Sequence, residues 1–267
     1  MYLQIFIRPV LFENSYTNHC ALRNMLKAVL IFCAVYAECA KNLPSFIEPC
    51  YRNDPKAGEC LLRNVRSLKP RLEKGIPELQ LPNLNPLLIS TAPLFSSGDF
   101  RGNMTDLKLY DVSNSETTYI DINFHEKVLV VEYTMTSMRM VTNYRLVGKL
   151  LMFQLDSTGE LKANITGLRM KYTGYLKMVQ RRGVEYLALN GSEAIGNIEY
   201  IHVEFTNLFK DNELLNRAAN DVLNDNYKII INDFGPVINR SCKIIIDTIL
   251  AGLFYKYPAD VLFPVKK

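Results

Sequence analysis

The sequence has no run of charge of one sign and no low-complexity tract. Its 31 lysines and arginines and 27 acidic residues are spread along 267 positions and give a formal net charge of +4. No basic stretch is long enough for a nucleic-acid surface, so no nucleic-acid partner is expected. Hydrophobic residues make up 48% of the chain, which favours a globular protein over a disordered one.

The sequence also has little of what hydrolytic or metal chemistry needs. It has no Gly-x-Ser-x-Gly motif, and no closely spaced group of histidines and acids predicts a metal site. His202 alternates with Glu204 on a predicted strand and is expected to face solvent or to pair with that carboxylate. We therefore expect no enzyme activity, no metal and no cofactor. A lipid esterase with a Ser-His-Asp group drawn from distant positions stays as an alternative.

Residues 25–37 carry the pattern of a signal peptide. A lysine precedes an apolar run over residues 28–36, and small residues lie at its end. A membrane anchor is the alternative, but the run is shorter than the roughly 20 apolar residues that span a bilayer. We therefore predict a secreted, extracellular protein without stable membrane insertion. Its single domain covers residues 38–267, and residues 1–24 are interpreted as an upstream extension.

Export determines how the six cysteines are interpreted. Two of them lie in segments that we expect to be removed, and Cys39 is close to the expected cleavage site. Cys50 and Cys60 enclose turn-forming residues that can bring two thiols together in an oxidising compartment, so we predict a disulfide between them. Cys242 lies in an apolar helical pattern and is expected to be a buried free thiol.

Export also makes the N-glycosylation sequons relevant. We predict glycans at Asn103, Asn164 and Asn190, in stretches that resemble strand ends and turns. A fourth sequon, at Asn239, lies inside a helical pattern and is not expected to be used.

Hydrophobic periodicity divides the chain into helical and β-rich parts. Apolar residues at helical spacing predict a first helix over residues 61–72. Three prolines exclude a helix over residues 76–86, which should run extended into the first strand. Residues 99–205 carry the signals of an antiparallel sheet. Residues 212–255 predict one long helix, with a kink at Pro236.

The sheet and the long helix must cover one another. Leu129 and Tyr133 belong to one alternating apolar face, and Tyr144 and Leu146 belong to another, and both faces are expected to point inward. Other apolar residues on the opposite face need cover as well. At 1.5 Å per residue, about forty helical residues reach about 60 Å, which is longer than a small domain is wide. We therefore predict an α+β fold in which a highly curved antiparallel sheet wraps the long C-terminal helix.

Several short segments, in this order, carry a resemblance to a known family. They are Leu43–Ile47 ahead of Cys50 and Cys60, Gly75–Leu79, Leu84–Leu87, Tyr144 with Gly148–Leu150, Phe205–Phe209, Leu223–Asn226 and Leu262–Pro264. Over residues 43–264 the chain resembles the takeout and juvenile-hormone-binding family of insects. The resemblance implies a TULIP-like fold, with a long helix wrapped by a curved sheet, and a secreted carrier of a small hydrophobic ligand. It also implies a role in circadian, feeding or chemosensory regulation.

The chain departs from the family pattern at three places. Asn85 stands where the family commonly has aspartate, and Tyr227 stands where tryptophan is common. Between Cys60 and Cys242 there is no cysteine, so the second disulfide typical of moth haemolymph hormone carriers cannot form. The takeout branch is therefore the closer likeness.

A carrier needs an apolar cavity with a few polar groups that orient the ligand. Six of the nine methionines fall between Met135 and Met178, and flexible thioethers suit elongated ligands. Buried tyrosine hydroxyls could bind an ester, epoxide or ketone oxygen, although ordinary core packing explains the same residues. The expected ligand is terpenoid, juvenile-hormone-like or fatty-acid-like. The residues predicted to line the tunnel are Leu129, Val131, Tyr133, Met135, Tyr144, Met152, Phe205, Val222, Tyr227, Phe234 and Ile238.

A monomer is expected. The alternative function that the same pattern allows is a secreted lipid-transfer or membrane-surface-binding module.

Overall fold

The structure is a computed structural model that describes residues 42–266 apart from 98–99, 151–152 and 211. These residues belong to one compact unit. The predicted signal peptide at residues 25–37 and the upstream extension at residues 1–24 lie outside the described residues and stay predictions.

The N-terminal part consists of a disulfide loop and one helix. Cys50 and Cys60 form the predicted disulfide. Helix α2 (Ala57–Leu72) begins inside this loop, four residues before the predicted start, and Gly75 follows its end with a φ of +76°. An added Cβ at Gly75 would lie 2.8 Å from the Leu81 carbonyl oxygen, so glycine is required where the chain turns back.

The proline-containing stretch after α2 is not wholly extended. A short 3₁₀ helix, η1 (Pro77–Leu79), interrupts it, and Ile76 pairs with Leu81 across this turn. Proline at the first position of η1 has a φ suited to a helical turn.

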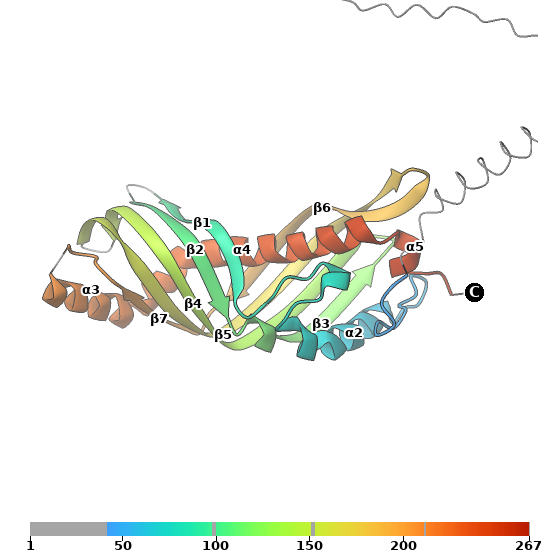
Figure 1. Cartoon of the computed structure of the whole chain (residues 1–267), viewed down its shortest axis with the longest axis horizontal. Coiled ribbons are helices and arrows are strands. Elements are labelled where there is room, and N and C mark those ends of the chain that lie inside the picture. Colours follow the sequence, from blue (N-terminus) through green and yellow to red (C-terminus); the bar gives the residue numbers. More distant parts are fainter. Residues whose placement is uncertain (1–41, 98–99, 151–152, 211, 267) are drawn as a thin grey trace, which may run out of the picture. The chain divides into compact units, whose positions relative to one another are not determined.

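All strands belong to one antiparallel sheet, drawn as arrows in Figure 1. The order is β1-β2-β4-β5-β6, while β3 pairs with β4 and β7 pairs with β5. The strands are β1 (Leu87–Ser97), β2 (Phe100–Tyr110), β3 (Glu116–Asn123), β4 (Val128–Leu150), β5 (Phe153–Arg181), β6 (Val184–Asn197) and β7 (Tyr200–Phe205), and a 3₁₀ helix η2 (Val112–Asn114) precedes β3.

Two very long strands let the sheet change partners along its length. In β4, residues 128–134 pair with β3 and residues 139–147 pair with β2, so residues 135–138 face neither strand. In β5, residues 161–166 pair with β7 and residues 169–181 pair with β6. The sheet therefore has two distinct ends joined by a middle that only β4 and β5 share.

The predicted single C-terminal helix is two helices. Helix α3 (Glu213–Asp225) ends at Asn226, and α4 (Tyr227–Lys256) continues without interruption through Pro236. The Asn226 side chain donates a hydrogen bond to the Val222 carbonyl (2.7 Å). Side-chain bonds of asparagine to nearby backbone compete with the regular hydrogen bonds of a helix. The break thus lies ten residues before the proline at which the sequence predicts a kink. A short helix α5 (Ala259–Leu262) follows.

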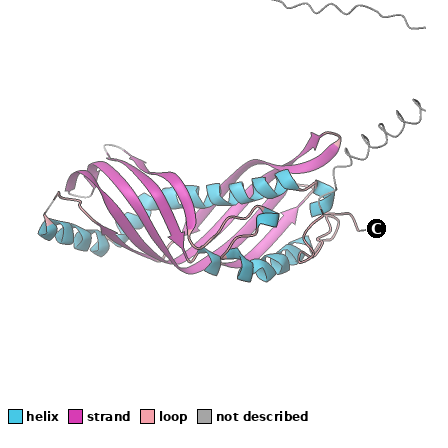
Figure 2. Ribbon diagram, in the orientation of Figure 1, coloured by secondary structure: helices cyan, strands magenta, loops and turns pink. Residues whose placement is uncertain are grey.

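The long helix lies along the sheet, as predicted. Helix α4 packs mainly against β6 and also contacts β1 and β7, while α2 packs against β3 (Figures 1 and 2). The large curled sheet, the C-terminal helix and the short N-terminal helix confirm the predicted α+β fold.

Three of the four sequon asparagines are exposed. Asn103, Asn164 and Asn190 lie inside β2, β5 and β6, so the expectation that they occupy strand ends and turns is wrong. Asn239 lies half-buried in α4. Glycosylation at the three exposed positions stays a prediction.

A polar cluster attaches α4 to the sheet. The Asp247 carboxylate accepts hydrogen bonds from the Tyr172 hydroxyl (2.7 Å), the Ser192 hydroxyl (2.6 Å) and the Lys243 ammonium (2.7 Å). Tyr172 is on β5 and Ser192 on β6, so one carboxylate ties the helix to two strands. Burial opposes the charged form of Asp247, but these hydrogen bonds and the Lys243 charge lower the pKa of the carboxyl below its usual value.

We predict that Asp247→Asn lowers the free energy of unfolding at neutral pH by about 1–2 kcal/mol, because the charge-assisted bonds are lost. The folded-state pKa is depressed, so the stabilisation is present above the pKa of the unfolded chain and is lost as pH falls below about 4. Urea unfolding of both proteins across this pH range measures the difference. Asp221→Asn, at an exposed aspartate of α3, should change little. Equal stability of Asp247→Asn and wild type at neutral pH would contradict a stabilising role for this carboxylate.

Candidate ligand-binding cavity

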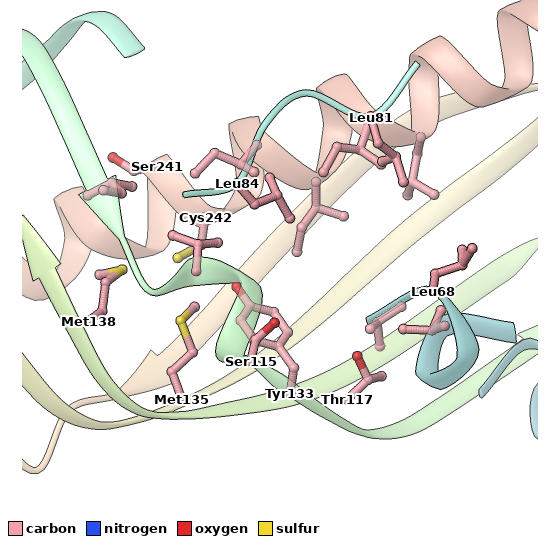
Figure 3. A pocket seen from close by; sticks show the side chains of 18 of the residues that line it. Leu68, Leu81, Leu84, Ser115, Thr117, Tyr133, Met135, Met138, Ser241 and Cys242 are labelled. Atoms are coloured by element: carbon pink, nitrogen blue, oxygen red, sulfur yellow. The ribbon is translucent and has the colours of Figure 1, made fainter. Parts of the chain in front are cut away.

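A cavity of about 380 Å³ lies between α4 and the sheet (Figure 3). Its walls come from α2, the segment over residues 79–84, η2, strands β2, β3 and β4, and α4 from Ile238 onward. Ile165 of β5, Ile201 of β7 and Phe263 complete the lining. This volume is within the range of about 300–1,000 Å³ typical of small-molecule pockets.

The cavity lies where two buried hydrophobic clusters meet. Met104 and Met138 belong to the cluster at the β1, β2 and β7 end, and Leu68 and Ile122 belong to the cluster around α2, β3 and α5. All four side chains line the cavity. Each end of the sheet thus has its own packed core, and the space between the two cores is not filled.

The inward face of β4 changes at the partner exchange. Leu129 and Met135 are buried at odd-numbered positions, whereas Met138 and Tyr144 are buried at even-numbered ones. The two residues at positions 136 and 137 are both exposed, so the strand turns over between the two methionines. Both apolar faces predicted from the sequence therefore point inward, one on each side of this point. The methionines at 135 and 138 both line the cavity (Figure 3).

The lining is apolar apart from a few neutral groups. The neutral groups are the hydroxyls of Ser115, Thr117, Tyr133 and Ser241 and the Cys242 thiol (Figure 3). Ser115 follows η2, and the others lie on β3, β4 and α4. No aspartate, glutamate, lysine, arginine or histidine is among the described lining residues.

Tyr133 and Cys242 are the two described lining residues whose side chains could ionise. Burial raises the pKa of both groups above their ordinary values, so both are neutral at physiological pH. Cys242 is buried and unpaired, as the sequence predicts.

Five of the predicted lining residues lie together in the cavity wall. They are Leu129, Val131, Tyr133, Met135 and Ile238.

Four other predicted residues lie outside the lining. The Tyr144 hydroxyl donates to the Thr206 carbonyl (2.6 Å), and its ring packs on Phe205 at 5.2 Å. Tyr227 packs on Tyr200 at 4.9 Å, and Val222 is half-buried on α3. Tyr144 and Phe205 belong to the packed core. Their sequence periodicity is that of any inward-facing residue, so it does not separate core residues from cavity residues. Of the remaining two predicted residues, Met152 is outside the described residues, and the side chain of Phe234 is also not described.

Sequence reasoning missed the walls that come from α2 and the loop after it. Leu61, Val65 and Leu68 face the cavity from α2, and Leu81 and Leu84 face it from the loop. The helical spacing of the three α2 residues was a usable signal, because an amphipathic helix beside a sheet must bury that face.

Within the described residues, no group of three or more histidine, cysteine, aspartate or glutamate side chains could hold a metal ion. Likewise, no helix in the described part of the chain is both long enough and apolar enough to cross a membrane.

Comparisons with known proteins agree with this architecture. The chain is 27% identical over 237 residues to the "Circadian clock-controlled protein daywake" of Drosophila yakuba, which covers 85% of this chain and 90% of that protein. The Drosophila melanogaster protein of the same name is 26% identical over the same shares. The crystal structure of Epiphyas postvittana Takeout 1 superposes with a TM-score of 0.71 at 17% identity, over 82% of this chain and all of the other.

The match to a family extends over most of the chain. Residues 28–264 match the family described as "Haemolymph juvenile hormone binding protein (JHBP)". Because that span includes the sheet, α4 and every wall of the cavity, the chain belongs to the haemolymph juvenile hormone binding protein family.

Proposed function

We propose that this protein is a secreted carrier that binds one small neutral hydrophobic ligand in the cavity between α4 and the sheet. The observation that carries the proposal is the cavity itself, which is about 380 Å³ in volume and has no charged lining residue among those described. Burying apolar ligand surface there contributes roughly 25 cal/mol per Å², which gives affinity without an ion pair.

The lining favours a neutral ligand over a fatty acid anion. Transfer of an unpaired carboxylate into an apolar cavity is costly, and the described lining offers no lysine, arginine or histidine to pair with it. Hydroxyls of Ser115, Tyr133 and Ser241 suit one ester, ketone, epoxide or alcohol oxygen. Of the ligand classes that the sequence predicts, the terpenoid or juvenile-hormone-like class therefore fits better than the free fatty acid.

The family and the relatives supply the context. The family is one of ligand carriers, and two similar proteins are named as circadian clock-controlled. A clock-linked, feeding or chemosensory role for this chain is part of the proposal, as are secretion and a monomeric state.

We predict that a fatty acid methyl ester displaces the fluorescent probe N-phenyl-1-naphthylamine at least about tenfold more strongly than the matching free acid at pH 7.5, because only the acid must bury a charge. The free acid should displace more probe as pH falls, because its carboxyl becomes neutral. Equal displacement by ester and acid at pH 7.5 would contradict a neutral site, and lack of probe uptake would contradict the carrier function.

We predict that Tyr133→Phe weakens binding of an ester or ketone by about three- to tenfold relative to a hydrocarbon of equal length, because one hydroxyl donor is lost. Tyr144→Phe is the matched control, since it removes a hydroxyl that is bonded to Thr206 outside the cavity. It should lower stability by about 1 kcal/mol and leave ligand preference unchanged. Probe displacement and thermal unfolding of both variants give the comparison. An equal change of ligand preference in the two variants would contradict a role of Tyr133 in ligand binding.

A further inference from the structure

The outer side of α4 carries an apolar stripe that no described residue covers. Its side chains recur every three or four residues and so share one face of the helix. The stripe consists of Arg240, Ile244, Thr248, Ala251 and Tyr255. Ile244 is 52% exposed and Tyr255 is 69% exposed.

The stripe and the cavity lie on different faces of the same helix. Ser241, Ile245 and Ile249 line the cavity, whereas Ile244 and Thr248 are exposed. In Figure 1, α4 lies along the sheet as a single layer of helix. One helix thickness therefore separates the stripe from the cavity.

The polar and charged groups of the stripe suit a lipid surface. The Thr248 hydroxyl donates to the Ile244 carbonyl (2.8 Å), so it needs no partner from water. Arg240 is exposed and has no ion pair among the described residues, and Arg181 lies over the Tyr255 ring at 4.7 Å. The nearby Asp247 carboxylate is bound to Lys243 and to the sheet. The stripe thus combines exposed apolar side chains with cations and has no uncompensated acid among its described residues.

We propose that this stripe docks α4 on an anionic phospholipid surface, with Ile244 and Tyr255 entering the interface. Interfacial helices bind in this way, through apolar side chains at the acyl boundary and arginine or lysine at the phosphates. The cations favour lipid phosphate over a second copy of this chain, because the stripe has no described acidic side chain free to pair with Arg240 of another copy. The use of this docking for ligand transfer rests on the proposed carrier function, but the docking itself does not.

The test is flotation of the full chain with vesicles of phosphatidylcholine, with and without phosphatidylserine. Wild type should float with the anionic vesicles, and added salt should weaken this binding. Ile244→Glu should lower the bound fraction at least about tenfold, and Arg240→Gln should reduce the preference for phosphatidylserine. Leu214→Glu is the matched control, because Leu214 is 77% exposed on α3 and outside the stripe, and it should float as wild type does.

Probe uptake into the cavity shows that each variant is folded and separates the two proposals. Vesicle binding by wild type that is lost in Ile244→Glu, with normal probe uptake, supports the docking face. Absence of vesicle binding, or equal loss in Leu214→Glu, overturns docking even if probe uptake is normal. A dimer in analytical ultracentrifugation that Ile244→Glu dissociates would overturn it too, in favour of a second copy.

Discussion

The architecture depends on how one long helix is held against a sheet with two separate ends. Helix α4 is fixed to β6 by packing and to β5 and β6 by the Asp247 carboxylate. Two hydrophobic clusters fill the space under the helix, one at each end of the sheet. The cavity is the part between them, at the point where β4 exchanges β3 for β2. A shorter helix or strands of ordinary length could not span both cores and leave this gap.

The chemistry of the cavity follows from its burial. Groups that could ionise, such as the Tyr133 hydroxyl and the Cys242 thiol, are kept neutral by desolvation. The carboxylate and ammonium that attach the helix lie outside the cavity lining, in the Asp247 and Lys243 pair. The charged pair and the apolar cavity are therefore separate parts of α4. The same helix is held to the sheet by polar bonds and offers an uncharged surface to a ligand.

The sequence predicts the fold well because its periodicities are long and consistent. The two alternating faces of β4, with Leu129 in one and Tyr144 in the other, both point inward in the structure. The loop between Cys50 and Cys60 has the turn residues that its disulfide needs. The break at Asn226 was missed because apolar spacing continues across it, while the hydrogen bonds that cap α3 there are local to one asparagine.

The site is less predictable for a physical reason. An inward-facing residue has the same pattern whether its neighbour is another side chain or an empty space. Val131 and Phe205 are equally apolar and both on strands, yet the first lines the cavity and the second packs in the core. The distinction depends on how distant elements fit together, which a single sequence does not contain.

The most direct test of a ligand-binding interior is native mass spectrometry of the full chain, secreted from insect cells and purified without detergent. The account predicts a chain carrying one neutral organic molecule, which is released when the protein is denatured and can then be identified. A chain of bare protein mass that also takes up no neutral ester added in excess would contradict it.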